Sequence, residues 1–356
     1  MLQIDGNYCE GGGQIVRTAL AFSALTGTSF EVDNIRKGRP EPGLKAQHLF
    51  GVKALKELCS ASVDGDYLGS EKLLFVPRKI MPRTLSIDIG TAGSITLLLQ
   101  SVLMPCMFAE KPTRLKITGG TDVAFSPSAD YFQYVLLPCL RNFADFQFSI
   151  EKRGYYPKGG GKIDLKIKPK YVYGDSPEAF LSEIRKKIKP FDLEYAGRLE
   201  LIKGVSHASA DLQKAEVAER QAASAKRALD NLKCPVKIDA SYSETFSTGS
   251  GITLWAVFSK NEEHYSIIGS DVLGERSKRA EAVGEEAAKK LISEISSKAA
   301  VDFHMADQLL PFMALSKGAF RASKITNHAR TNIYTIEQFL GKTFTVDEEE
   351  KIIRTV

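Results

Sequence analysis

The chain has few cysteines and no long apolar run, and each scarcity excludes a class of protein. Its five cysteines are odd in number, widely scattered and without a CxxC pair, so neither a disulfide framework nor a cysteine-rich zinc site is indicated. The longest apolar candidate, Ile95 to Ala109, stops at Glu110, short of the ~18 to 20 residues that a membrane span needs. The N-terminal sequence MLQIDGNYCEGGG has neither the basic nor the hydrophobic region of a secretion signal. We therefore expect a cytoplasmic protein without a membrane partner.

Length and charge are typical of a large globular protein. With 356 residues, 43% hydrophobic and 26% charged, the chain exceeds the ~250 to 300 residues at which a single core stops growing, so we expect more than one domain. The net charge of +5 and the pI near 8.7 are mildly basic. That balance is compatible with nucleic acid, and equally with an enzyme whose substrate is a small anion.

A pair of helix patterns followed by strand-like segments recurs at a spacing of about 80 residues, which indicates internal repetition. The third unit would end in the strand-like stretches GKTFTV and KIIRTV. The three predicted helix pairs are 11–27 with 42–58, 92–109 with 126–143, and 279–295 with 305–318.

Between the second and third units the order changes to strand, helix, strand, strand, with the helix expected from Gln213 to Leu232. This order indicates a small inserted domain. We predict an α/β (α+β) fold in which residues 1–175 and 274–356 form a large domain of about three repeated units, each of two helices on a β-sheet. A smaller α/β domain, residues 176–273, is inserted into it.

Three consecutive glycines, Gly11 to Gly13, precede the first apolar helix pattern. Glycine lets the backbone approach an anion closely, and the N–H groups at a helix start point toward that anion. Gln14 and Arg17 follow at a spacing of three and therefore share one helical face. Glu10 stands just before the turn, where a carboxylate either ligates Mg²⁺ or interacts with the helix dipole.

A second polar cluster consists of Arg36, Arg39, Gln47 and His48 and includes a turn rich in proline and glycine. Guanidinium forks match phosphate oxygens in bidentate geometry, so two arginines on a stiff loop are suited to clamp a terminal phosphate. The alternative is that one of the arginines only caps a helix or forms a salt bridge.

Further polar residues stand in apolar or glycine-rich surroundings. Gln100 lies within an apolar helix pattern, where a lone amide usually satisfies a buried neighbour. Asp307 and Gln308 precede the pattern LLPFMAL, so Asp307 is expected as a helix N-cap. Tyr155 and Tyr156 precede a GGG run and offer a stacking surface for RNA, although a hairpin also explains the glycines.

The segment KITNHARTNIYTIEQF places His328 at the start of a predicted helix. A neutral imidazole nitrogen can attack an α-phosphorus while a divalent cation and arginines neutralise the departing pyrophosphate. Asn332 follows four residues later and is expected to share the helical face and orient the ring. A structural role is the alternative, since satisfied histidines are commoner than nucleophiles.

These segments, in this order, resemble the RNA 3′-terminal phosphate cyclase family. The resemblance covers nearly the whole chain and is weakest between about residues 176 and 273. The family's covalent histidine is the H of an H-x-x-T-N motif, so the resemblance implies that His328 is the catalytic nucleophile. It also implies ATP contacts at Gln100, Pro127, His304, Met305, Ala306, Asp307 and Gln308, phosphate contacts at Gln14, Arg17, Arg36, Arg39, Gln47 and His48, and a metal ligand at Glu10.

The activity that the resemblance implies is the ATP-dependent conversion of an RNA 3′-terminal phosphate into a 2′,3′-cyclic phosphate, carried out by a ligase with Mg²⁺ or Mn²⁺. His328 would take AMP from ATP, the RNA phosphate would take that AMP, and the adjacent 2′-OH would close the ring. One rival is a non-catalytic, cyclase-like RNA-binding protein of ribosome assembly. Another is a small-molecule transferase with the related enolpyruvyl transferase architecture. The sequence favours no oligomeric state.

Overall fold

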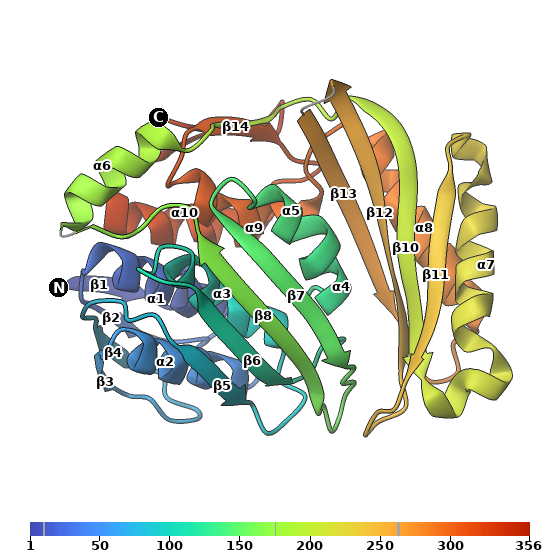
Figure 1. Ribbon diagram of the computed structural model, residues 1–356. Helices are drawn as coiled ribbons and strands as arrows, with labels where there is room; N and C mark the ends of the chain where they lie inside the picture. The colour runs from blue at the N-terminus through green and yellow to red at the C-terminus, as the bar shows by residue number, and fades with distance from the viewer. Residues whose placement is uncertain (10, 175, 262–263) are drawn as a thin grey trace.

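Four four-stranded sheets and the helices packed on them make up the fold (Figure 1). The computed structural model describes residues 1–9, 11–174, 176–261 and 264–356. The mixed α/β prediction is confirmed. Within these ranges, no helix has the length and apolar character that crossing a membrane requires.

Three of the sheets share one topology. Their orders are β1-β2-β4-β3, β5-β6-β8-β7 and β9-β14-β16-β15. In each, the first two strands are parallel, the second is antiparallel to the fourth, and the third and fourth form an antiparallel pair. The strands are β1 (Leu2–Asp5), β2 (Phe30–Asp33), β3 (Ser62–Asp64), β4 (Leu73–Val76), β5 (Thr84–Asp88), β6 (Thr113–Gly119), β7 (Ala144–Lys152), β8 (Gly161–Pro169), β9 (Phe191–Leu193), β14 (Gly318–Arg321), β15 (Phe344–Asp347) and β16 (Ile352–Thr355).

Two helical segments accompany each of these sheets and pack toward the middle of the body. α1 contacts α2, α3 and α10, and every residue from Gln14 to Leu25 is buried, so polar side chains on this helix lie in the interior. The helical segments are α1 (Gln14–Thr26) and α2 (Ala46–Leu58); α3 (Ile95–Cys106) and the continuous run of α4 (Ala129–Tyr131), a π-helical turn (Phe132–Leu136) and α5 (Leu137–Cys139); and α9 (Phe303–Met313) and α10 (Asn327–Leu340).

The fourth sheet, of order β11-β10-β12-β13, forms the insert with two helices on one face (Figure 1). α6 (Pro177–Lys187) precedes β9 and connects the second unit to the third. The elements of the insert are β10 (Arg198–Ser209), two short 3₁₀ turns (Ala210–Ala215 and Asp230–Leu232), α7 (Val217–Leu229), β11 (Val236–Ser243), β12 (Ser250–Asn261), β13 (His264–Leu273) and α8 (Ala280–Ser296).

The composition of the third unit differs from the prediction. α8 was expected to pair with the helix at 305–318, but it packs on β12 and β13 and along α7. β9 was assigned to the insert, but it pairs in parallel with β14. The helices of the third unit are therefore α9 and α10, and we propose that the insert runs from Arg198 to Ser296, between β9 and α9. An amphipathic helix such as α8 can bury its apolar face against either sheet, so its sequence pattern does not show which sheet it packs on.

Side-chain caps fix where the site helices begin. Asp302 caps α9, because its carboxylate accepts hydrogen bonds from the N–H groups of His304 and Met305 at 3.0 and 2.9 Å. The expectation that Asp307 caps this helix was therefore wrong, and Asp307 lies inside α9. The helix expected from Gln213 to Leu232 is also shorter, because 3₁₀ turns flank α7.

Candidate active site

Gln14, at the first position of α1, joins three helices at one point. Its side-chain Nε2 donates to the backbone oxygen of His328, at the start of α10, over 2.8 Å. The same nitrogen lies 3.5 Å from Oδ2 of Asp307 on α9. Residues from the two ends of the chain, predicted to act together, therefore lie side by side.

Arg17 occupies the next turn of α1 and is only 7% exposed. Its Nε donates to Oε1 of Gln100 on α3 over 2.8 Å, and its Nη1 lies 3.2 Å from Nε2 of His48 on α2. Burial lowers the pKa of the guanidinium to about 10, although the nearby Asp307 carboxyl opposes this effect. Arg17 therefore remains a cation at neutral pH, held in a low-dielectric interior where its field is strong.

His48 is a buried neighbour of this cation. The ring is 3% exposed, and its Nδ1 accepts a hydrogen bond from the backbone N–H of Lys45 over 3.1 Å. Burial, followed by the charge of Arg17, holds the pKa of His48 well below its ordinary value, so the ring is neutral. A Cβ built on Gly13 would lie 2.0 Å from Nε2 of this ring, which explains why a glycine stands at the helix start.

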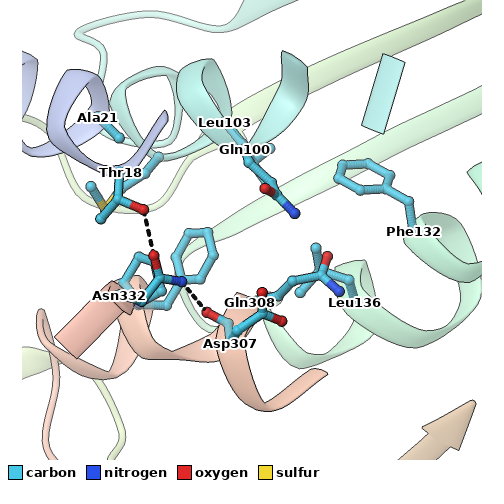
Figure 2. Close-up of a pocket in the computed structure, with 12 residues that line it drawn as sticks. Thr18, Ala21, Gln100, Leu103, Phe132, Leu136, Asp307, Gln308 and Asn332 are labelled. Carbon is cyan, nitrogen blue, oxygen red and sulfur yellow. Dashed lines mark hydrogen bonds between the residues drawn. The ribbon is translucent and has the colours of Figure 1, made fainter. Parts of the chain in front are cut away.

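Asn332 holds α1, α9 and α10 together (Figure 2). Its Oδ1 accepts from Oγ1 of Thr18 at 2.6 Å, and its Nδ2 donates to the backbone oxygen of Asp307 at 2.7 Å. Both ends of the amide are thus engaged with Thr18 and Asp307, and the role of Asn332 in orienting the ring of His328 stays a prediction. Thr18 was missed, because a threonine in an apolar helix carries no sequence signal of a polar partner.

A cavity opens between these helices (Figure 2). Gln100, Asp307 and Gln308, three predicted ATP contacts, line it, and Phe132 and Leu136 supply part of an apolar wall. The remaining lining residues are Thr18, Ala21, Leu103, Met104, Pro311, Phe312 and Asn332.

Four other predicted ATP contacts do not line this cavity. Met305 and Ala306 are 1% and 0% exposed, with their side chains in the core. The ring of His304 meets the edge of Tyr131 at 6.0 Å between centroids. Pro127 lies next to the start of α3, because its backbone oxygen accepts from Oγ1 of Thr96 over 2.7 Å.

The loop with the two arginines packs near the glycine turn. A Cβ built on Gly12 would lie 3.9 Å from Nη2 of Arg39. Arg36 Nη1 donates to the backbone oxygens of Glu41 and Gly43 at 2.6 and 3.1 Å, so part of this guanidinium stabilises its own loop. Burial lowers the pKa of Arg36, and the neighbouring Arg39 lowers it further. For Arg36, these contacts support the alternative that the arginine has a structural role.

Gln47, Glu10 and His328 complete the predicted set. Oε1 of Gln47 lies 3.5 Å from a Cβ built on Gly93, beside the start of α3. Glu10, the predicted metal ligand, lies outside the described residues. His328 is exposed in the first turn of α10, which begins where predicted because Oγ1 of Thr326 accepts from the N–H of Ala329 over 3.1 Å.

Comparison with known proteins bears on this arrangement. A family model described as RNA 3′-terminal phosphate cyclase matches residues 8–346. The chain belongs to this family. Relatives of that name include a Pyrococcus abyssi protein, 43% identical over 98% of this chain and 96% of its own length. Others come from Archaeoglobus fulgidus, 42% identical over 99% and 100%, and from Methanosarcina mazei, 44% identical over 98% of both chains.

In this member of the cyclase family, a buried polar cluster joins the insert to the second unit. Arg153 Nη1 lies 3.2 Å from Asp122 Oδ2 and 2.7 Å from Asp130 Oδ2, and His207 Nε2 on β10 lies 3.3 Å from Asp122 Oδ1. Burial raises the pKa of the Asp122 carboxyl, but His207 and Arg153 outweigh that effect and hold it below its ordinary value. The guanidinium supplies the positive charge that two buried carboxylates require.

Tyr155 belongs to this cluster as well. It is 3% exposed, and its hydroxyl lies 2.8 Å from Nδ1 of His207. The expectation that Tyr155 offers a stacking surface was therefore wrong, whereas Tyr156 is 76% exposed. Adjacent residues of a turn face opposite directions, and the sequence did not show which tyrosine faces inward.

The titration of the Asp307 carboxyl should be visible in the pH dependence of the free energy of unfolding. Burial raises the pKa of its carboxyl to about 7, against the lowering effect of Arg17, whereas an unfolded aspartate titrates near ~3.9. Between these values the folded state binds more protons than the unfolded state, so this group lowers stability as pH rises from about 4 to about 7. Asp307→Asn removes the titration. In urea unfolding, the free energy of unfolding of the variant should rise relative to that of the unmodified protein across this pH range. A difference that does not change with pH would contradict the assignment.

Proposed function

We propose that the protein converts the 3′-terminal phosphate of RNA into a 2′,3′-cyclic phosphate at the expense of ATP. The observation that carries this proposal is the buried Arg17, which is bonded to Gln100 at the cavity between the helices, together with Gln14 of the same helix, which is bonded to the helix start that bears His328. The shared family and the relatives' common name support the same activity.

The ATP base and sugar occupy the cavity, and the phosphates extend toward the start of α1. Arg17 accepts no proton and supplies fixed positive charge to the phosphates. Because Arg17 donates to Oε1 of Gln100, the amide NH₂ of Gln100 faces the cavity as a donor (Figure 2). Gln14 fixes the first turn of α10 through the backbone oxygen of His328 and so limits movement of the nucleophile.

The chemistry proceeds in three balanced displacements. An imidazole nitrogen of His328 attacks the α-phosphorus, and the bond to pyrophosphate breaks. An oxygen of the RNA 3′-phosphate then attacks the same phosphorus, the N–P bond breaks, and an RNA–adenylate anhydride forms. Finally the adjacent 2′-OH attacks the terminal RNA phosphorus, loses its proton and releases AMP. Arg39 and, in part, Arg36 contact the RNA phosphate.

A divalent cation would neutralise charge on the departing pyrophosphate. The residue predicted to hold it is Glu10, and Mg²⁺ or Mn²⁺ with oxygen ligands suits a carboxylate at that position. Among the described residues, Asp307 is the carboxylate that lies beside Gln14 and Arg17. We propose Glu10 as the ligand because the resemblance implies it and because the raised pKa of Asp307 leaves that carboxyl partly protonated at neutral pH.

The test uses ATP labelled at the α-phosphate. The proposal expects acid-labile, base-stable label on the protein, and cyclic product from an oligoribonucleotide that ends in a 3′-phosphate but none from the same RNA ending in 3′-OH. The rival, a non-catalytic cyclase-like protein of ribosome assembly, predicts RNA binding without label. Equal product from both RNA ends would contradict the cyclase activity.

A further inference from the structure

The two central strands of the second sheet, β6 and β8, carry a row of exposed cations on their outward face. Along β6 and β8 the burial alternates, so that apolar residues such as Leu115 and Ile163 face the helices and charged residues face outward. Figure 1 shows these strands in the foreground with no helix drawn over them. The exposed cations, which we call the basic face, are Arg114, Lys116, Lys162, Lys166 and Lys168.

The exposed carboxylates of this sheet, Asp88, Asp145 and Glu151, lie on the edge strands β5 and β7. Arg114 is paired with Asp164, with both carboxylate oxygens within 3.0 Å of Nε. In the part of the chain that the structure describes, no ion pair joins Lys116, Lys162, Lys166 or Lys168 to a carboxylate. The four ammonium groups are therefore available to an external anion.

The repeated architecture provides an internal comparison. The matching outward face of the first sheet is acidic, with Asp5, Glu31, Asp33 and Asp64 on its strands. The matching strands of the third sheet carry both signs, as in Asp192, Arg321, Asp347 and Arg354. One topology thus tolerates three charge patterns, so the fold itself does not require cations on the second sheet.

The basic face continues toward the candidate active site through the hairpin before β8. A Cβ built on Gly159 would lie 2.5 Å from the backbone oxygen of Thr91, so this hairpin packs on the loop that starts α3. Gly93 of that loop neighbours Gln47, one of the predicted phosphate contacts. Gln100 lies five residues into α3, about 8 Å along the axis from its start.

The hairpin also presents aromatic surface beside further cations. Tyr156 is 76% exposed. Phe246, from the loop between β11 and β12, is 58% exposed and lies against the hairpin, because a Cβ built on Gly160 would lie 2.2 Å from its ring. Nζ of Lys152 stands 3.8 Å above the ring of Phe246. Cations that follow a backbone, with aromatic rings on which bases stack, are the features by which proteins hold single-stranded nucleic acid.

We propose that the basic face binds the sugar–phosphate backbone of the RNA upstream of its 3′ end, and that Tyr156 and Phe246 stack on bases as the strand passes the hairpin to the active site. This inference rests on the proposed function, because the RNA end must lie at the predicted phosphate contacts. Lysines bind backbone phosphates without reading bases, so one enzyme can use RNA ends of many sequences.

The test compares two triple variants that lose the same charge. The first combines Lys116→Gln, Lys162→Gln and Lys166→Gln on the basic face. The control combines three exposed lysines of the insert, Lys203→Gln, Lys226→Gln and Lys237→Gln. Both are assayed with a 3′-phosphorylated oligoribonucleotide of about 16 nucleotides, which can span a strand-binding surface, and with a 3′-phosphorylated dinucleotide, which cannot.

We expect the first variant to need more of the long RNA for half-saturation, while its use of the dinucleotide and its labelling by ATP stay unchanged. Each lost phosphate contact lowers the dependence of log affinity on log salt by ~0.7, so three lower it by about 2. Over a fourfold rise in salt the unmodified protein should therefore lose about 20-fold more affinity for the long RNA than the first variant. The control should match the unmodified protein.

Equal salt dependence in the two triple variants would overturn the proposal and leave the basic face to an acidic protein partner. An equal loss with the dinucleotide would also overturn it, because the lysines would then act at the RNA terminus. The same comparison, made by fluorescence anisotropy with an RNA ending in 3′-OH, needs no catalysis. It therefore tests the basic face even if the cyclase activity is not found.

Discussion

Replacing His328 with alanine should abolish the transfer of label from α-labelled ATP to the protein and leave its thermal unfolding unchanged. The side chain is exposed in the first turn of α10, and the helix start is capped by Thr326 rather than by His328. Exposed substitutions of this kind change stability by no more than ~0.5 kcal/mol. Loss of label without loss of fold therefore isolates the chemical role of the imidazole.

Asn327→Ala is the matched control for this experiment. Asn327 is exposed in the same helical turn and offers no nucleophilic nitrogen lone pair. It should retain labelling, whereas His328→Ala should lose it. Normal labelling in His328→Ala would remove this residue as the nucleophile. Loss in both variants, with intact unfolding curves, would assign the effect to the shape of the helix start.

Gly13→Ala should damage both stability and adenylylation, for a purely steric reason. Gly13 has φ −64° and ψ −4°, a conformation that alanine adopts freely, so backbone strain is not the cause. The new Cβ would meet Nε2, Cε1 and Cδ2 of His48 at 2.0, 2.3 and 2.9 Å. That ring is buried, accepts from the backbone N–H of Lys45 and lies 3.2 Å from Nη1 of Arg17, so we expect a shift of the ring to disturb Arg17.

We expect Gly13→Ala to cost ~1 to 3 kcal/mol of unfolding free energy, as overpacking usually does. Displacing the buried cation should slow adenylylation by at least ~100-fold, the scale of losing one charge-stabilising group. Gly12→Ala provides the control for the unfolding measurement, since its Cβ would have no protein neighbour closer than 3.9 Å. Urea unfolding and single-turnover labelling measure the two effects. Equal behaviour of the two variants would show that the space around His48 is unimportant.

Local signals in the sequence predicted much of the fold. The helix that begins beside His328 was predicted because its start depends on neighbouring residues, and so were the final strands β15 and β16. β9 was misassigned because it has three residues and a parallel partner that lies beyond the whole insert. Pairing at such a distance leaves no pattern in the segment itself.

The site was predicted less completely, because several roles depend on tertiary partners. The proximity of Gln14 to His328 was expected from the resemblance, and the hydrogen bond between them agrees with it. The partners of Asn332 and the inward position of Tyr155 are decided by helices and strands far away in the chain. The sequence shows which side chains are present, and only packing decides which of their neighbours satisfies them.

The position of the insert has a consequence for synthesis of the protein. β9 leaves the ribosome before the insert, whereas its partner β14 and the helix that bears His328 follow only after the insert is made. The first two units can therefore fold early, while the third must wait with an unpaired strand edge, which invites aggregation. A nascent chain halted within the insert should depend most on chaperones. Longer nascent chains, in which β14 has emerged, should no longer need them.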